Sequence, residues 1–161
     1  MIGIEEIRKS VETAYGSLAD PNYGFVAKVE SRSPYRDLME KLGLKIEFTE
    51  TTDINDDVAF CYSGVSRCGE GVDIRLSMVG RYGYVCGEDG KPLIGSEEPW
   101  LKEIFEILEQ EQVDVLSQAI LEEGIPLALW TGEEANVFNA LFSSVECLPW
   151  EVDRDDLRST L

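Results

Sequence analysis

The sequence predicts a single α+β domain over residues 1–161, in which an antiparallel sheet of about four or five strands carries helices mainly on one face. Two observations predict this class. Strand-like segments follow one another through the middle third of the chain, and the N-terminal segment and the acidic final third are mostly helical. A run of strands followed by a run of helices is typical of α+β proteins. With 161 residues, of which 43% are hydrophobic, the chain is long enough to form one core without a disulfide or metal.

The first third of the chain is predicted to hold two helices separated by a strand. Apolar residues recur at intervals of three and four over residues 4–18, which predicts an amphipathic helix. Alternating apolar residues over 23–29 predict a short strand. Ser33, followed by proline, is expected to cap a second helix that runs to about Leu42 and ends at Gly43.

Four strands are predicted in the middle third, over residues 44–49, 58–62, 72–78 and 82–86. Apolar and polar residues alternate over 44–49 and 72–78, which is the period of a half-buried strand; Val58, Phe60 and Tyr62 continue this period, and 82–86 follows across a turn at residues 80–81. The connections between them are short and polar. Consecutive strands joined in this way usually pair as an antiparallel meander.

Three helices are predicted in the final third, from apolar stripes over residues 101–108, 113–121 and 137–142. Ser96 is expected to cap the first of them. Thr131 is expected to cap the third through a capping box with Glu134. The apolar run 125–130 is predicted as a strand or a buried connector, and Asp153 as the cap of a last short helix.

Acidic side chains outnumber basic ones most strongly near the C-terminal end. The chain has 32 acidic residues, 14 basic residues and no histidine, for a net charge of −18. Residues 81–161 carry 18 of the acidic residues and 5 of the basic ones. Such an excess predicts a negative field that steers a basic partner; the alternative is a surface kept soluble by its charge. Direct binding of nucleic acid is not expected, because neutralising phosphates needs clustered Lys and Arg.

Exposed acidic residues and one tryptophan form the candidate partner-binding surface. Glutamates supply steering and rim contacts to a basic partner, and Trp130 supplies an anchor, because tryptophan is enriched in interface hot spots. The acidic loop of residues 53–57 is a further candidate for the same surface. The candidate residues are Glu97, Glu98, Glu103, Glu106, Glu109, Glu122, Glu123, Trp130, Glu133, Glu134, Asp53, Asp56 and Asp57.

The loop of residues 53–57 also has the Asp-x-Asn-x-Asp start of a calcium-binding EF-hand loop. However, Val58 stands where the EF-hand requires glycine, and Gly64 stands where it requires a bidentate glutamate. We therefore exclude an EF-hand. A hairpin turn and weak binding of a divalent ion remain the alternatives to partner binding, and the hairpin turn is favoured between these two.

No catalytic residue, metal site or cofactor is predicted. Without histidine, neither a Ser–His–Asp nor a Cys–His arrangement is possible, and no glycine-rich loop matches a phosphate-binding motif. The four cysteines form no CxxC pair. Cys61 and Cys86 lie in apolar, strand-like runs, where cysteine usually behaves as a small core residue. We therefore expect a protein that is not an enzyme.

A cytoplasmic location with reduced thiols is expected. The N-terminal residues become acidic at Glu5 and Glu6 and do not resemble a secretory signal. No apolar run reaches the ~18 residues that a membrane-spanning helix requires, so no membrane partner is expected.

Four segments between Val72 and Val145 resemble bacterial immunity proteins, the cytosolic antidotes encoded beside polymorphic or contact-dependent toxins. These segments are VDIRLSMVGRYGYV, EPWLKEIFEILEQ, VDVLSQAILEEG and EEANVFNALFSS. The resemblance implies a non-enzymatic protein that neutralises a basic, nuclease-like toxin domain by covering its cationic cleft. The alternatives are a DNA mimic that inhibits a DNA-binding protein, and an acidic domain with a small-ligand or chaperone role.

Overall fold

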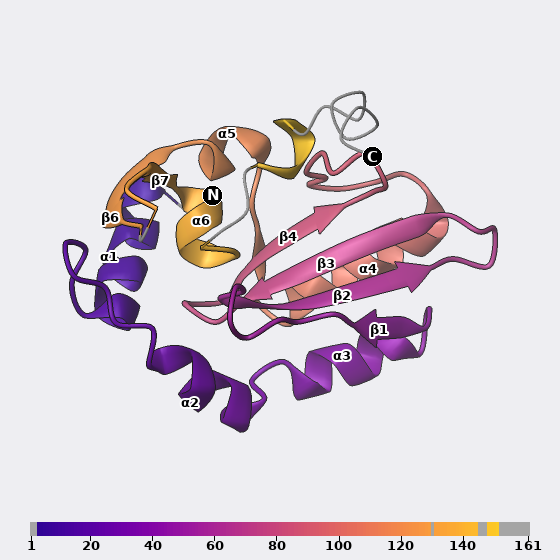
Figure 1. The fold of residues 1–161 in the computed structure, drawn as a ribbon. Helices are drawn as coiled ribbons and strands as arrows, with labels where there is room; N and C mark the ends of the chain where they lie inside the picture. The colour runs from indigo at the N-terminus through magenta and orange to yellow at the C-terminus, as the bar shows by residue number, and fades with distance from the viewer. Residues whose placement is uncertain (1–2, 130, 145–147, 152–161) are drawn as a thin grey trace, which may run out of the picture.

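The computed structural model describes residues 3–129, 131–144 and 148–151 and has the α+β class that the sequence predicts (Figure 1). The helices are α1 (Ile4–Tyr15), α2 (Phe25–Arg32), α3 (Arg36–Gly43), α4 (Pro99–Gln110), α5 (Gln118–Leu121) and α6 (Val137–Leu141), followed by the 3-10 turn η1 (Pro149–Glu151). The strands are β1 (Phe48–Glu50), β2 (Ala59–Val65), β3 (Gly71–Ser77), β4 (Tyr82–Cys86), β5 (Asp114–Val115), β6 (Gly124–Ala128) and β7 (Glu134–Asn136).

The main sheet has five strands in the order β1-β2-β3-β4-β5. The first four strands form the antiparallel meander that the sequence predicts. The fifth strand corrects the expectation of a wholly antiparallel sheet, because β5 runs parallel to β4 and pairs Asp114 with Tyr82 and Val115 with Gly83. Strands β6 and β7 form a separate antiparallel pair.

Two buried clusters of apolar side chains lie against the main sheet, and β4 contributes to both. One cluster joins α3 and α4 to the sheet, and Val85 of β4 belongs to it. The other joins α1, α5, α6 and the β6–β7 pair, and Tyr82, Tyr84 and Cys86 of β4 belong to it. Figure 1 shows α4 behind the sheet and α1, α6 and β6 gathered at one end of it. Alternate side chains of β4 point to opposite faces of the sheet, and each face is covered by one of the two clusters. All five residues of β4 are therefore buried.

The second cluster connects the two ends of the described chain. The hydroxyl of Tyr15 in α1 donates a 2.7 Å hydrogen bond to the carbonyl oxygen of Ala140 in α6. The ring of Tyr15 makes edge-on contacts with Tyr23 and Phe25, at 5.2 and 4.9 Å between ring centroids. The N-terminal helix is thus held in place by the C-terminal part of the domain.

The strand predicted over residues 23–29 is wrong, because this segment begins the helix α2. Its apolar residues serve a helix as well as a strand: Phe25 and Val29 are one helical turn apart, and Val26 is buried beside them. Ser33 does not cap α3. It ends α2 in the left-handed region, with φ 47° and ψ 58°, and α3 begins only at Arg36.

The strand predicted over residues 44–49 is shorter than expected. The backbone N–H groups of Leu44 and Ile46 donate to carbonyl oxygens of α3, so a turn continues to Ile46 and β1 starts at Phe48. As a result Leu44 is 85% exposed, whereas Ile46 is buried.

The single helix predicted over residues 113–121 is also wrong. Gln112 adopts a left-handed conformation with φ 60° that turns the chain away from the axis of α4. The next residues then pair with β4, because Asp114 donates its N–H to the carbonyl of Arg81 and Leu116 donates to that of Gly83. Only the end of the predicted segment, α5, is helical.

The predicted helix caps of the final third are corrected as well. Ser96 lies two residues before Glu98, the residue that precedes α4, and its hydroxyl accepts the N–H of Glu98. Thr131 does not cap α6, because the strand β7 lies between them. Asn136 caps α6 instead: its side chain accepts the N–H of Asn139, whose side chain accepts the N–H of Asn136. The run predicted over 125–130 contributes to the strand β6, and the helix predicted at Asp153 lies outside the described residues.

The two candidate caps of α6 differ in the stability that they confer. We expect Asn136→Ala to lower the free energy of unfolding by about 1 kcal/mol, because it removes the capping box. Thr131→Ala serves as the control and should change it by less than about 0.5 kcal/mol, as is usual for exposed surface substitutions. Urea denaturation followed by circular dichroism measures both, and equal losses would contradict the assignment of Asn136.

Candidate partner-binding surface

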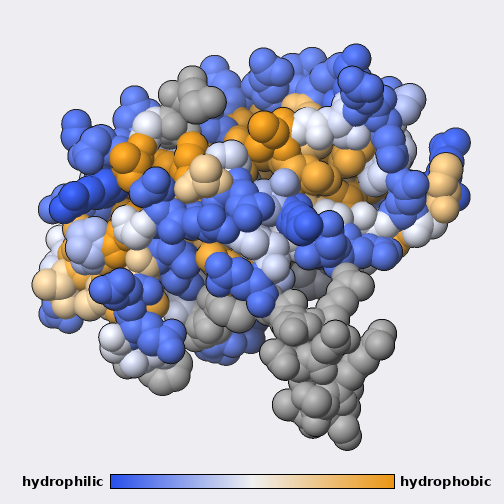
Figure 2. Space-filling view, turned by 90° about the horizontal axis from the view of Figure 1, so that it is seen from above, coloured by the Kyte–Doolittle hydropathy of each residue, from blue (hydrophilic) through white to orange (hydrophobic). Residues whose placement is uncertain are grey.

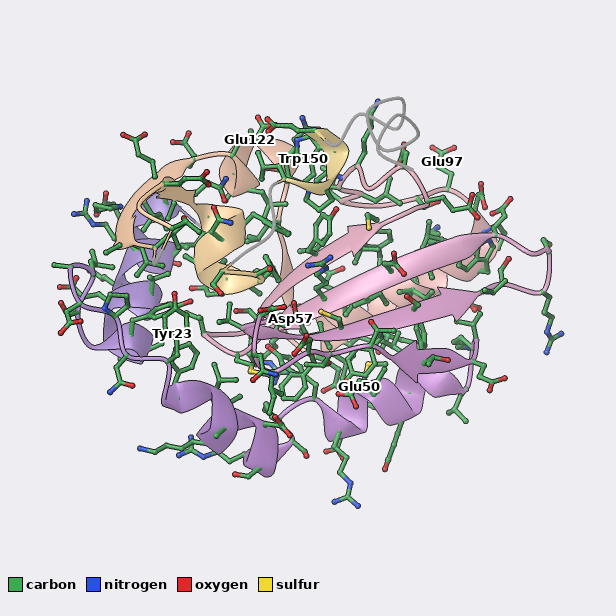
Figure 3. All side chains as sticks on the ribbon, viewed as in Figure 1. Tyr23, Glu50, Asp57, Glu97, Glu122 and Trp150 are labelled. Carbon is green, nitrogen blue, oxygen red and sulfur yellow. The ribbon has the colours of Figure 1, made fainter. Side chains whose placement is uncertain are left out.

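The candidate acidic residues lie on four separate parts of the surface rather than in one patch. They belong to α4 and the residues before it, to the end of α5, to the β6–β7 hairpin and to the loop before β2. Figure 3 shows Glu122 beside α5, Glu97 farther along the same edge of the molecule, and Asp57 near the start of β2. Trp130, the expected anchor, lies outside the described residues.

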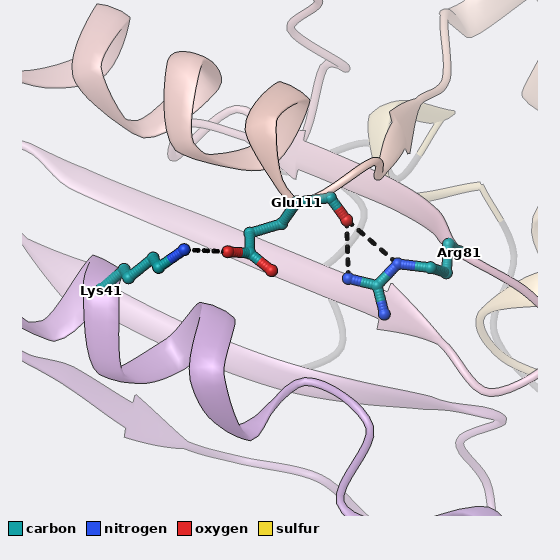
Figure 4. A network of polar contacts seen from close by, with 3 residues as sticks. All are labelled: Lys41, Arg81 and Glu111. Carbon is teal, nitrogen blue, oxygen red and sulfur yellow. Dashed lines mark hydrogen bonds and ion pairs between the residues drawn. The ribbon is translucent and has the colours of Figure 1, made fainter.

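Helix α4 is neutralised by basic residues on one side. Lys45, which follows α3, forms an ion pair with Glu103 at 3.7 Å. Lys41 of α3 forms an ion pair with Glu111, and the backbone carbonyl of Glu111 accepts hydrogen bonds from Arg81 at 3.1 and 2.7 Å (Figure 4). Glu111 was not a candidate on sequence grounds, and the structure assigns it to the junction of α3, α4 and β4.

The other side of α4 keeps its negative charge. Glu106 and Glu109 are exposed, and within the described part of the chain neither forms an ion pair with a basic side chain. Asp114, four residues after Gln110, is also exposed. Lys102 is the one basic residue of α4. It lies one helical turn before Glu106 on this side, so Glu106, Glu109 and Asp114 leave a strip of net negative charge on the side of α4 that faces away from α3.

An apolar groove runs beside this strip. The groove has a volume of about 300 Å³ and lies between α4, β5 and α5. Its lining residues are Ile94, Phe105, Glu109, Val113, Asp114, Val115, Leu116, Ser117 and Ile120. Figure 2 shows apolar side chains gathered on this face of the molecule between hydrophilic ones. The groove is not predictable from the sequence, because its apolar residues come from segments that only the fold brings together.

Two of the candidate glutamates hold tryptophan side chains. Glu122 accepts hydrogen bonds from Gln118 at 3.0 Å and from the indole of Trp150 at 2.7 Å, and these bonds lower the pKa of its carboxyl group. Glu98 accepts the indole N–H of Trp100 at 2.9 Å. Hydrogen bonding and repulsion from Glu98 raise the pKa of Glu70 on the neighbouring loop. Glu98 and Glu122 therefore position aromatic rings in addition to carrying charge.

Asp57 is not the surface residue that the sequence analysis expected. Its side chain is buried, with 8% exposure, whereas Asp53 and Asp56 are exposed. The carboxylate of Asp57 accepts the N–H of Asp53 at 2.8 Å, and the thiol of Cys61 lies 3.6 Å from the same oxygen. The carbonyl of Asp56 accepts the N–H of Ser144, which ties the loop to the segment after α6. Asp57 therefore stabilises the loop from within.

A second cavity, of about 570 Å³, lies between α2, α3 and the strands β1 and β2. Three glutamates and one arginine surround its aromatic wall; they are Glu30, Glu40, Glu50 and Arg36. Tyr62 forms part of that wall, and its burial together with the charge of Glu50 raises its pKa to about 12. The phenol is therefore neutral at physiological pH.

The sheet face opposite α4 carries a cavity of about 140 Å³ that is lined in part by Cys61, Cys86 and Arg75. Burial raises the pKa of the Cys86 thiol to about 11, so it stays protonated and is a poor nucleophile near neutral pH. Arg75 lies over the rings of Tyr84 and Phe138, at 6.0 and 5.5 Å from their centroids. These contacts place the guanidinium among the packed aromatic residues of the core.

A search of the described residues finds no group of three or more acidic or cysteine side chains placed to hold a metal ion. The same part of the chain contains no helix with both the length and the apolarity needed to span a membrane. Comparisons with protein-family models, with curated proteins and with solved structures give no match to this chain.

Substitution of the buried Asp57 should cost more stability than substitution of the exposed Asp56. We expect Asp57→Ala to lower the free energy of unfolding by about 2 kcal/mol, because hydrogen bonds to a charged group contribute about 1.5–3 kcal/mol. Asp56→Ala, whose side chain is exposed, should cost less than about 0.5 kcal/mol. Guanidinium denaturation measures both. A negligible cost for Asp57→Ala would show that its carboxylate is a surface group after all.

The cysteines should differ in reactivity in the order of their burial. Cys68 is exposed, whereas Cys61 and Cys86 are buried. In the folded protein at pH 8 we expect iodoacetamide to modify Cys68 before Cys61 and Cys86, the other two cysteines in the described part of the chain. Cys86 should react only on unfolding, because its thiol is both buried and protonated. Mass spectrometry of peptides from timed samples measures the order, and labelling of Cys86 as fast as Cys68 would refute it.

Proposed function

We propose that this protein is a non-enzymatic, cytoplasmic binding protein of the immunity type, which neutralises a basic, nuclease-like toxin domain by covering its cationic cleft. The one-sided neutralisation of α4 is the observation that supports this proposal most directly. The side facing α3 is paired with Lys41 and Lys45, whereas Glu106 and Glu109 on the other side are exposed to solvent.

The charge that remains is suited to attracting a basic protein. At physiological ionic strength, charges interact over a Debye length of about 8 Å, so neighbouring carboxylates on one strip act together. A field of this kind raises association rates by about 10- to 1,000-fold. The exposed ion pairs on the α3 side contribute little to stability, since such pairs are worth about 0–1 kcal/mol. Glu106 and Glu109 form no ion pair within the described residues, and attraction of a basic partner is the role that we assign to them.

The distribution of the acidic residues favours a basic protein over a DNA-binding target. A DNA mimic needs carboxylates spaced like phosphates along one elongated face. Here the candidate acidic residues belong to four separate segments, and two of them, Glu98 and Glu122, are also engaged with tryptophan side chains.

The product of the gene immediately upstream is the first partner to test. Co-expression should give a stable complex and should relieve the toxicity of that product in a bacterial host. The association rate constant should fall by about tenfold or more between 50 and 500 mM NaCl, because steering is screened by salt. If no complex forms, or if the association rate does not depend on salt, the proposal is wrong.

A pair of charge variants tests the role of α4 in this steering. Glu106→Gln with Glu109→Gln should slow association several-fold at low salt, because both remove charge from the strip. Glu5→Gln with Glu12→Gln removes the same charge from exposed positions of α1 and serves as the control. Stopped-flow kinetics measures both, and equal slowing would show that only the net charge matters.

A further inference from the structure

The groove between α4, β5 and α5 brings four incompletely buried apolar side chains together. Phe105 comes from α4, Val115 from β5, Ile120 from α5, and Ile94 from the loop before α4. Ile94 is 69% exposed, and the other three are partly buried. Contiguous exposed apolar surface of this kind is typical of a binding site.

The short length of β5 explains why the groove exists. β5 has only two residues and is the last strand of the sheet, so no further strand covers its outer side. Val113 and Leu116, on either side of β5, are buried in the domain. The groove therefore lies beyond the edge of the sheet, with α4 and α5 at its sides and Val115 of β5 at its base.

The rim of the groove is negative. Glu109 and Asp114 line it directly, and Glu106 adjoins Phe105 on the exposed side of α4. Lys41 and Lys45 contact Glu111 and Glu103 rather than these carboxylates, and Lys102, one turn before Glu106, offsets one of the three negative charges. An occupant must therefore offer apolar side chains to the floor and positive charge to the rim.

We propose that this groove is the docking site for a cationic amphipathic segment of the basic partner; the inference rests on the proposed function. Apolar side chains of the segment fill the space between Phe105, Val115 and Ile120, and its Lys or Arg side chains contact Glu109 and Asp114. Charge complementarity selects this occupant over a second copy of the chain, because two copies with a net charge of −18 each repel one another.

A pair of synthetic peptides tests the groove without the natural partner. The first has the sequence KLAKLAKKLAKLAK, and the second replaces each leucine by serine and keeps the charge. Isothermal titration calorimetry should show at least about tenfold tighter binding of the leucine peptide, because only it brings apolar side chains to the floor. In ¹⁵N-labelled protein the largest amide shifts should fall on the groove residues. Equal affinities, or shifts centred elsewhere, would overturn the proposal.

Two exposed apolar residues provide a matched pair of variants. Ile94→Ser should weaken binding of the leucine peptide several-fold, because Ile94 lines the groove. Leu44→Ser is the control: Leu44 is 85% exposed, follows α3 and does not line the groove. Both positions are exposed, so both variants should fold, and circular dichroism checks this. The same loss in both variants would overturn the proposal.

The same two variants separate this inference from the proposed function. If the upstream gene product binds with a salt-dependent rate and Ile94→Ser does not weaken the complex, the groove is not the docking site and the immunity role stands. If the leucine peptide binds at the groove and the upstream product does not bind at all, the groove stands and the immunity role fails. Weakening of both complexes by Ile94→Ser, with no effect of Leu44→Ser, supports both.

Discussion

Burial of β4 from both sides is the constraint on which the rest of the structure depends. Val85 points into the cluster formed with α3 and α4, and Tyr82, Tyr84 and Cys86 point into the cluster formed with α1, α5 and α6. Helices α3 and α4 also pack on β2 and β3, whereas the group of α1, α5 and α6 meets the sheet mainly through β4. The group of α1, α5 and α6 is therefore positioned on the sheet mainly by one strand of five residues.

The sequence predicted those parts of the fold whose pattern is set locally. Residues 72–78 alternate between apolar and polar side chains, residues 82–86 form a short apolar run after a turn, and β3 and β4 lie there. The predictions failed where a segment fits two patterns and distant contacts decide between them. Residues 23–29 alternate like a strand but form the start of α2 against Tyr15, and residues 113–121 have helical spacing but begin by pairing with β4.

For the candidate site, too, some features were predictable from the sequence and others depend on the fold. The excess of negative charge and its concentration after residue 80 are properties of composition, so they could be read directly. The fold decides which carboxylates are paired. Lys41 of α3 pairs with Glu111, and Lys45, in the turn after α3, pairs with Glu103. The burial of Asp57 and the grouping of Ile94, Phe105 and Ile120 around one groove depend on how the chain folds, and no local spacing of residue types predicts them.

The hydrogen bond from Tyr15 to Ala140 spans 125 residues and has a consequence for synthesis on the ribosome. Helix α1 leaves the ribosome before α6, which supplies part of the surface that covers its apolar side. The meander of β1 to β4 and its α3–α4 cover are complete earlier in the chain. The apolar side of α1 can therefore reach its final packing only after α6 has been synthesised, and it emerges before that surface exists.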